Sequence, residues 1–176
     1  MKVSVSKIPE GGMHLRFERD EAWFQERLVA SQAEIFVVRN IAAECTVRRL
    51  KETVFVTGTV TAEVEMPCCR CLETTVLPLD ASFKYTFAPP PGESREEWEL
   101  TAEDLDYAYY QEDTIDLDDI VFEQIVLQVP IKSLCQESCK GLCPHCGGNL
   151  NRVSCQCRSD VVDERLAVLK TLKVQS

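Results

Sequence analysis

The stretch VFVTGTVTAEVEMPCCRC, residues 54–71, decides how this chain folds. Its first part, Val54–Met66, is rich in valine and threonine, which favour β-strands. The strand runs to Pro67, and a Cys68-Cys69-Arg70-Cys71 turn follows directly before the next run of strand-forming residues. Two cysteines separated by two residues can present their thiolates to one metal ion. The stretch therefore predicts a β-hairpin whose tip is a metal-binding turn.

The neighbouring segments predict more strands and a few helices. Asp20 and Asp116 each precede an apolar pattern, so we expect them to cap helices that run to about Ala30 and Val129. Pro130 should end the second helix, and a last helix is expected after Asp160. The expected strands are Val3–Ser6, Met13–Phe17, Ile35–Val38, Cys45–Leu50, Val54–Met66, Val76–Phe87 and Tyr107–Tyr110.

Together these elements predict an α+β fold. Successive strands with short connections imply an antiparallel β meander, with a few helices packed on it. Residues 1–130 are expected to form this core domain, which includes an acidic segment, 93–123. Residues 131–176 are expected to form a cysteine-rich zinc-binding module and a C-terminal helix packed on the core.

The cellular compartment decides what the ten cysteines do. Residues Met1–Pro9 lack the apolar run of about 7–15 residues that a signal peptide needs. No stretch of about 18 apolar residues is present that could span a bilayer. We therefore expect a cytoplasmic protein with no membrane partner, in which thiols stay reduced and clustered cysteines bind metal.

Eight of the cysteines have the spacing of structural zinc sites, for one ion or two. Two groupings fit this spacing. The favoured grouping places Cys68, Cys71, Cys135 and Cys139 in one site and Cys143, Cys146, Cys155 and Cys157 in the other. The alternative keeps Cys135, Cys139, Cys143 and Cys146 together and sends Cys155 and Cys157 to the sheet.

Three further residues are expected to bind no metal. Cys69 is expected to point away from the metal, Cys45 to lie in the core and His145 to lie in an exposed loop.

The net charge of −10 arises mainly from one segment. Residues 93–123 hold thirteen acidic residues and one arginine. Such a protein is a poor non-specific nucleic-acid binder, because lysine and arginine supply the affinity for phosphate. The segment fits either a solvated loop or a contact with a basic partner such as a ribosomal protein. Arg70 is expected either to screen the thiolates or to reach a partner. The other basic residues expected to contact RNA or protein are Lys132, Lys140, Arg152, Arg158, Lys170 and Lys173.

The chain combines several motifs: the CxRC turn after a strand, Val129-Pro130, Leu134-Cys135, the run from Cys139-Lys140-Gly141-Leu142-Cys143-Pro144 to Asn149-Leu150-Asn151, and Cys155-x-Cys157. These motifs resemble the YceD family, the large ribosomal RNA subunit accumulation proteins, in a form with a zinc- and cysteine-rich C-terminus. The resemblance implies a bacterial or plastid protein needed for normal levels of 23S ribosomal RNA. The implied partners are a ribosomal RNA precursor or a large-subunit ribosomal protein of the pre-50S particle.

Nothing in the sequence predicts catalysis. The chain has two histidines, His14 and His145, and no phosphate-binding glycine loop. Zinc held by four thiolates has no open position for water or substrate. We therefore expect a non-enzymatic zinc-binding factor that supports 23S ribosomal RNA accumulation or processing and large-subunit assembly, without a small-molecule substrate. The alternative is a redox-sensitive zinc chaperone, in which oxidation of the CxxC and CxC pairs ejects zinc and exposes apolar surface.

Overall fold

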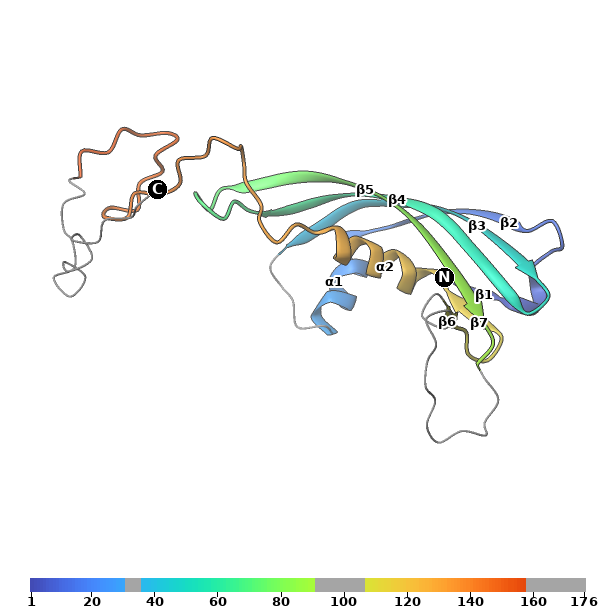
Figure 1. Cartoon of the computed structure of the whole chain (residues 1–176). Helices are drawn as coiled ribbons and strands as arrows, with labels where there is room; N and C mark the ends of the chain where they lie inside the picture. Colours follow the sequence, from blue (N-terminus) through green and yellow to red (C-terminus); the bar gives the residue numbers. More distant parts are fainter. Residues whose placement is uncertain (31–35, 91–106, 158–176) are drawn as a thin grey trace, which may run out of the picture.

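A long, curved sheet forms the body of the protein (Figure 1). The computed structural model describes residues 1–30, 36–90 and 107–157. Within these residues four strands follow one another as an antiparallel meander, which confirms the predicted arrangement. A short strand then adds to the edge of the sheet and runs parallel to its neighbour. The strands are β2 (Met13–Arg19), β3 (Val37–Leu50), β4 (Thr53–Pro67), β5 (Thr74–Ala88) and β6 (Ala108–Tyr109).

A bulge in β3 keeps the apolar side chains on one face of the sheet. Val38 pairs with Val64 on β4, but the register shifts by one residue between Arg39 and Ala42. Asn40, which has a positive φ of 54°, lies in this shift. The extra residue lets Val38 and Ile41 both face the core, although they are three positions apart. The prediction of two strands, Ile35–Val38 and Cys45–Leu50, is therefore wrong: the bulge absorbs the break in alternation and one strand continues.

Gly58 in the middle of β4 makes room for an aromatic ring. A Cβ atom added at Gly58 would lie 2.7 Å from the ring of Phe83 and 2.4 Å from the carbonyl oxygen of Glu44. Phe83 is buried and lies opposite Gly58 on β5. The ring of Phe83 on the neighbouring strand thus fills the space that a side chain at position 58 would occupy.

The two α-helices of the described residues lie on the same side of the sheet (Figure 1). α1 (Glu21–Ala30) packs against β3, and α2 (Leu117–Gln128) packs against β4 and β5. Both predicted caps are confirmed, because Asp20 Oδ1 accepts a hydrogen bond from Trp23 N at 2.9 Å and Asp116 Oδ1 accepts one from Asp118 N at 3.0 Å. The helices cover the apolar face with buried side chains that include Phe24, Leu28, Leu117, Val121 and Ile125.

A small second sheet pairs β1 (Lys2–Ser4) with β7 (Thr114–Asp116). The sequence predicted that the first strand reaches Ser6, and this is wrong because Val5–Lys7 form a 3-10 helix, η1. The Asp113 carboxylate bends the chain here, since it accepts hydrogen bonds from Ser6 N at 2.9 Å, Ser6 Oγ at 2.6 Å and Ser4 Oγ at 2.7 Å.

After α2 the chain runs to the tip of the β4–β5 hairpin (Figure 1). Residues 131–157 form no helix or strand and contain an isolated bridge between Leu142 and Asn149. The helix expected after Asp160 and residues 93–106 of the acidic segment lie outside the described residues. The division into a core, 1–130, and a cysteine-rich module, 131–176, therefore stays a prediction. No helix in the described part of the chain is long and apolar enough to cross a membrane.

A buried carboxylate joins the start of α2 to β2. Asp118 is 8% exposed, pairs with Arg19 at 2.8 Å and also pairs with the Met1 ammonium. Burial alone would raise the pKa of Asp118, but the hydrogen bond and charge of the Met1 ammonium, together with Arg19, lower this pKa below its ordinary value. The resulting stabilisation is present above the unfolded pKa of about 3.9 and is lost as the pH falls through the lower, folded pKa.

Replacing this carboxylate, Asp118→Asn, should lower the free energy of unfolding by about 3 kcal/mol at pH 7, because the Met1 ammonium and Arg19 lose their buried counter-charge. Urea unfolding between pH 7 and pH 2 measures the effect. The difference from the wild type should shrink below about pH 4, as the wild-type carboxylate takes up its proton.

The matched control is Asp119→Asn, because that side chain is 68% exposed and pairs with Arg27 at 2.6 Å. It should change the free energy of unfolding by less than about 1 kcal/mol. A loss at Asp118→Asn that stays constant down to pH 2 would contradict the role assigned to its charge.

Candidate metal centre

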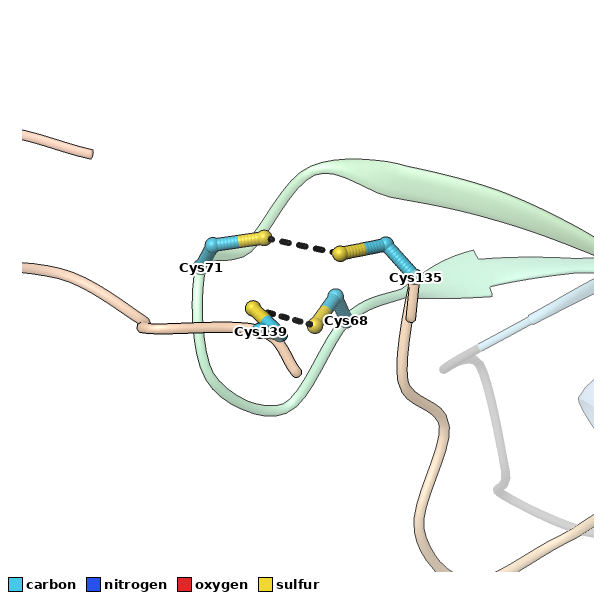
Figure 2. Close-up of side chains that lie close together, drawn as sticks. All are labelled: Cys68, Cys71, Cys135 and Cys139. Carbon is cyan, nitrogen blue, oxygen red and sulfur yellow. Dashed lines mark hydrogen bonds between the residues drawn. The ribbon is translucent and has the colours of Figure 1, made fainter. Parts of the chain in front are cut away.

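Four cysteines from two distant segments meet at the tip of the β4–β5 hairpin (Figure 2). The hairpin turn supplies Cys68 and Cys71, and the segment after α2 supplies Cys135 and Cys139. We call this set the hairpin cluster. Its sulfurs point toward one another, with Sγ–Sγ distances of 3.8 Å for Cys68–Cys139 and 3.7 Å for Cys71–Cys135. Tetrahedral zinc with Zn–S bonds of about 2.3 Å needs sulfurs about 3.8 Å apart, so the arrangement fits zinc.

Hydrogen bonds hold the later segment against the hairpin turn. Cys69 N donates to Ser133 O at 2.9 Å, and the Ser133 hydroxyl donates to Pro67 O. Leu142 N donates to Arg70 O at 3.1 Å. Hydrogen bonds of the protein alone therefore fix the segment to the hairpin turn on both sides of Cys135 and Cys139.

Arg70 connects the two segments through its side chain. Its Nη1 donates to the carbonyl oxygens of Glu137 at 3.2 Å and Cys139 at 2.9 Å. The sequence suggested that Arg70 either screens the thiolates or contacts a partner, and it did not indicate these bonds. The guanidinium has several donors directed in one plane, so it can bind two carbonyls of a tight loop at once. Arg70 therefore positions the loop that carries Cys139.

The remaining four cysteines form a second set, which we call the distal cluster: Cys143, Cys146, Cys155 and Cys157. Sγ–Sγ distances of 3.4 Å for Cys143–Cys155 and 3.6 Å for Cys146–Cys155 again fit one small metal ion. His145 lies exposed in the turn and outside this group of sulfurs. Gly147 has a positive φ of 70° and donates its N–H to Cys143 O at 2.9 Å, which closes the CxxC turn.

The structure thus brings the cysteines together in the favoured grouping and not in the alternative. Cys45 is buried in β3, as expected for a core residue, and burial raises its pKa to about 11. Cys69 is exposed and belongs to neither cluster. Zinc itself, and its binding by these eight residues, stay predictions.

Backbone amides favour one thiolate in each cluster. The amide hydrogen bonds of Cys135, Arg70 and Cys71 lower the pKa of Cys68 to about 6. Those of Cys146 and His145 do the same for Cys143, whose pKa is also about 6. The pKa of Cys135 rises to about 12, from desolvation and neighbouring sulfurs. Cys68 and Cys143 are therefore thiols that lose their protons readily, and metal binding would release the proton of any thiol such as Cys135 whose pKa is raised.

Asn151 links the two clusters. It lies in the loop between the two cysteine pairs of the distal cluster, and its Nδ2 donates to Cys139 Sγ of the hairpin cluster at 3.2 Å. This bond lowers the pKa of the Cys139 thiol. The Asn151 side chain also accepts a hydrogen bond from Lys140 N at 2.8 Å. The sequence indicated Asn151 only within the run that carries the family resemblance and suggested no role of its own for it.

The expected partner-contact residues have different surroundings. Arg70 makes the bonds described above, and Arg152 pairs with Glu73 at 2.5 Å. Lys132 and Lys140 are exposed and make no ion pair within the described residues. Arg158, Lys170 and Lys173 lie outside the residues that the structure describes. Contact of any of them with RNA or protein stays a prediction.

The two clusters predict two zinc ions per chain. Metal analysis of the reduced wild type should find two, and Cys68→Ser and Cys146→Ser should each lose one, because each removes one of four ligands. The control, Cys69→Ser, should keep two. A wild type that holds no zinc while its thiols titrate fully would contradict the metal assignment.

The clusters differ in burial, and so zinc should leave them at different rates. Three cysteines of the hairpin cluster are buried and only Cys135 is exposed. In the distal cluster only Cys143 is buried, whereas Cys146 and Cys157 are exposed and Cys155 is half-buried. A chelator or oxidant should therefore remove zinc from the distal cluster first. Comparing release from Cys146→Ser, which keeps the hairpin cluster, with release from Cys68→Ser, which keeps the distal one, measures this. Equal rates would contradict it.

One family of known proteins matches both clusters. The family described as large ribosomal RNA subunit accumulation protein YceD matches residues 56–173. This range covers most of β4, all of β5 and α2, and all eight clustered cysteines. No solved structure matches the chain.

Relatives from several organisms share parts of the sequence. An uncharacterized protein of Mycobacterium tuberculosis is 33% identical over 57% of this chain and 47% of its own length. The uncharacterized protein YlbN of Bacillus subtilis is 32% identical over 66% of this chain and 64% of its own. The large ribosomal RNA subunit accumulation protein YCED homolog 1, chloroplastic, of Arabidopsis thaliana is 26% identical over 99% of this chain and 58% of its own. The chain thus spans about half to two thirds of the length of these relatives.

Proposed function

The chain belongs to the YceD family of large ribosomal RNA subunit accumulation proteins, and we propose that it is a non-enzymatic zinc-binding factor of large-subunit assembly. In this proposal it acts in the cytoplasm and supports the accumulation or processing of 23S ribosomal RNA. Its partner is a component of the pre-50S particle. No small-molecule substrate enters this role.

The observation that carries the proposal is the hairpin cluster. Its four sulfurs come from two segments that are more than sixty positions apart, and they lie within 4.8 Å of one another. A tetrahedral zinc with four thiolate ligands has no open coordination position. Zinc here therefore joins segments rather than activating a substrate, and its binding free energy adds to the stability of the joined structure.

The surroundings of the clusters support a structural role in the same way. Arg70, Ser133 and Asn151 are all used to hold the loops that present the cysteines. Each of these bonds fixes backbone or a sulfur, as expected around a structural metal site whose ligands must be held in position.

A second function, a redox-sensitive zinc chaperone, is favoured by the exposure of the distal cluster. Cys146 and Cys157 are accessible to oxidants, and their CxxC and CxC spacing allows disulfides once zinc has left. This function requires that oxidised protein suppress the aggregation of an unfolded client such as chemically denatured citrate synthase. If oxidation releases zinc but the oxidised protein does not suppress client aggregation, the chaperone function is excluded.

The proposed function is tested in cells depleted of the protein. We expect the ratio of 23S to 16S ribosomal RNA to fall on depletion and to recover with the wild-type gene. The double variant Cys68→Ser, Cys71→Ser should not restore the ratio, because the later segment is no longer joined to the hairpin. The control is Cys69→Ser, which changes the exposed cysteine of the same turn and should restore it.

Immunoblots must show that the variants accumulate to the wild-type level. An unchanged ratio on depletion would contradict the link to large-subunit ribosomal RNA. Full rescue by the double variant would show that the hairpin cluster is not needed for this function, but it would leave the link to large-subunit ribosomal RNA intact.

A further inference from the structure

The CxxC turns of the two clusters share one hydrogen bond and one positive φ, but the residue that adopts this φ differs between them. In the distal turn, Gly147 N donates to Cys143 O at 2.9 Å, and Gly147 has a φ of 70°. In the hairpin turn, Leu72 N donates to Cys68 O at 2.9 Å, and Leu72 has a φ of 61°. A leucine thus occupies the left-handed position that a glycine fills in the equivalent turn.

This conformation is unfavourable for leucine. A Cβ atom crowds the backbone at positive φ, and glycine alone adopts it without cost. Asparagine and aspartate are the residues that tolerate it best otherwise. Among the described residues, the other non-glycine residues with positive φ are all polar: Asn40, Lys51, Glu112 and Asp113. Leu72 is the apolar exception.

The fold gains little apolar burial from Leu72 in return. Its side chain is 65% exposed, whereas Leu134 and Leu142 are the leucines that pack against the buried cysteines of the hairpin cluster. Glycine at position 72 would close the same turn without strain, as Gly147 does in the distal turn. Strained, exposed side chains of this kind occur where a binding function requires them.

Further apolar side chains are exposed at the same end of the molecule. The ion pair between Glu73 and Arg152 joins the residue after Leu72 to the residue before Val153, and Val153 is 53% exposed. Ile131 is fully exposed, two residues before Ser133, which bonds to the hairpin turn. Several exposed apolar side chains on rigid, cross-linked loops are typical of a protein-binding surface.

Charge favours a basic protein over RNA as the partner. The described residues 67–76 and 131–157 carry four basic side chains and two acidic ones. Each zinc with four thiolates would bring a formal charge of −2, so this end becomes net acidic once both clusters are filled. An acidic surface repels phosphate and attracts basic groups. A leucine side chain, which cannot hydrogen-bond to bases or phosphates, fits an apolar pocket in a protein.

We infer that Leu72 is the apolar anchor by which this protein docks onto a basic protein component of the pre-50S particle. The zinc-held turn fixes the leucine in an exposed position, and the surrounding negative charge complements the partner. This inference rests on the proposed function and specifies the partner contact within it.

The experiment measures binding of the full-length, zinc-loaded chain to precursor large-subunit particles. The particles are isolated from depleted cells, and the RNA extracted from them serves as a second probe at the same salt concentration. The variants are Leu72→Asn and Leu72→Gly, both of which suit a positive φ. The matched control is Leu50→Asn. Leu50 is 66% exposed and is the last residue of β3, beside the start of β4 and therefore far from the hairpin turn.

The wild type should bind the particles and not the extracted RNA. Both Leu72 variants should bind the particles at least about tenfold more weakly, as for an anchor side chain in a protein pocket. Leu50→Asn should bind like the wild type. All variants should hold two zinc ions, and Leu72→Gly should have a Tm equal to the wild-type value or up to about 4 °C higher.

Two results would overturn the anchor role alone: Leu72→Asn that binds particles as the wild type does, or a Tm of Leu72→Gly well below the wild-type value. Binding of wild type to extracted RNA as tightly as to particles would replace the protein partner by RNA. A wild type that binds neither probe would count against the proposed function itself.

Discussion

The structure of the cysteine-rich end depends on one closure, which joins the tip of the β4–β5 hairpin to the segment after α2. The hairpin is a long, two-sided ladder whose free end lies beyond both helices (Figure 1). Such an end has little core of its own, since its buried cluster consists of Cys68, Cys71 and Cys139 with Leu134 and Leu142 packed against it. In the proposed zinc-bound form, a single ion held by the four thiols that converge at this point replaces the missing core. The same ion would fix where the following loop and the distal cluster lie.

This arrangement explains how an irregular chain of residues 131–157 acquires a defined structure. Apart from one bridge, it has no helix or strand to satisfy its backbone groups. Arg70 donates to two of its carbonyl oxygens and Asn151 accepts from Lys140 N. The Glu73–Arg152 ion pair adds a link between this segment and the distant hairpin. The thiolates, their amide donors and these side chains form one connected network. Its exposed surface carries the strained Leu72.

Much of the fold follows from local sequence signals. The helix caps at Asp20 and Asp116, the stop at Pro130 and the strand before the CxRC turn were all predictable from local chemistry. The convergence of Cys68 with Cys139 was predictable as one of two groupings, because metal geometry limits how eight cysteines can share ions. Choosing between the groupings required the long-range path of the chain.

Other features depend on contacts that no local pattern reveals. The bulge at Asn40 is needed only because β3 must match the buried face of β4, and the bend after Ser4 depends on Asp113, which lies more than a hundred residues away. The bonds of Arg70 to Glu137 and Cys139 likewise require the folded loop. The positive φ of Leu72 is hidden in the sequence, because a leucine after a CxxC motif gives no sign of it.

We propose that one metal ion joins Cys68 and Cys71 to Cys135 and Cys139. Cadmium-113 NMR of the cadmium-substituted chain, with couplings traced to assigned cysteine β-protons, identifies which cysteines share an ion. We expect two cadmium signals, one coupled to those four residues and one to Cys143, Cys146, Cys155 and Cys157. A signal coupled to Cys135, Cys139, Cys143 and Cys146 together would contradict it, since the hairpin would then be left out of that site.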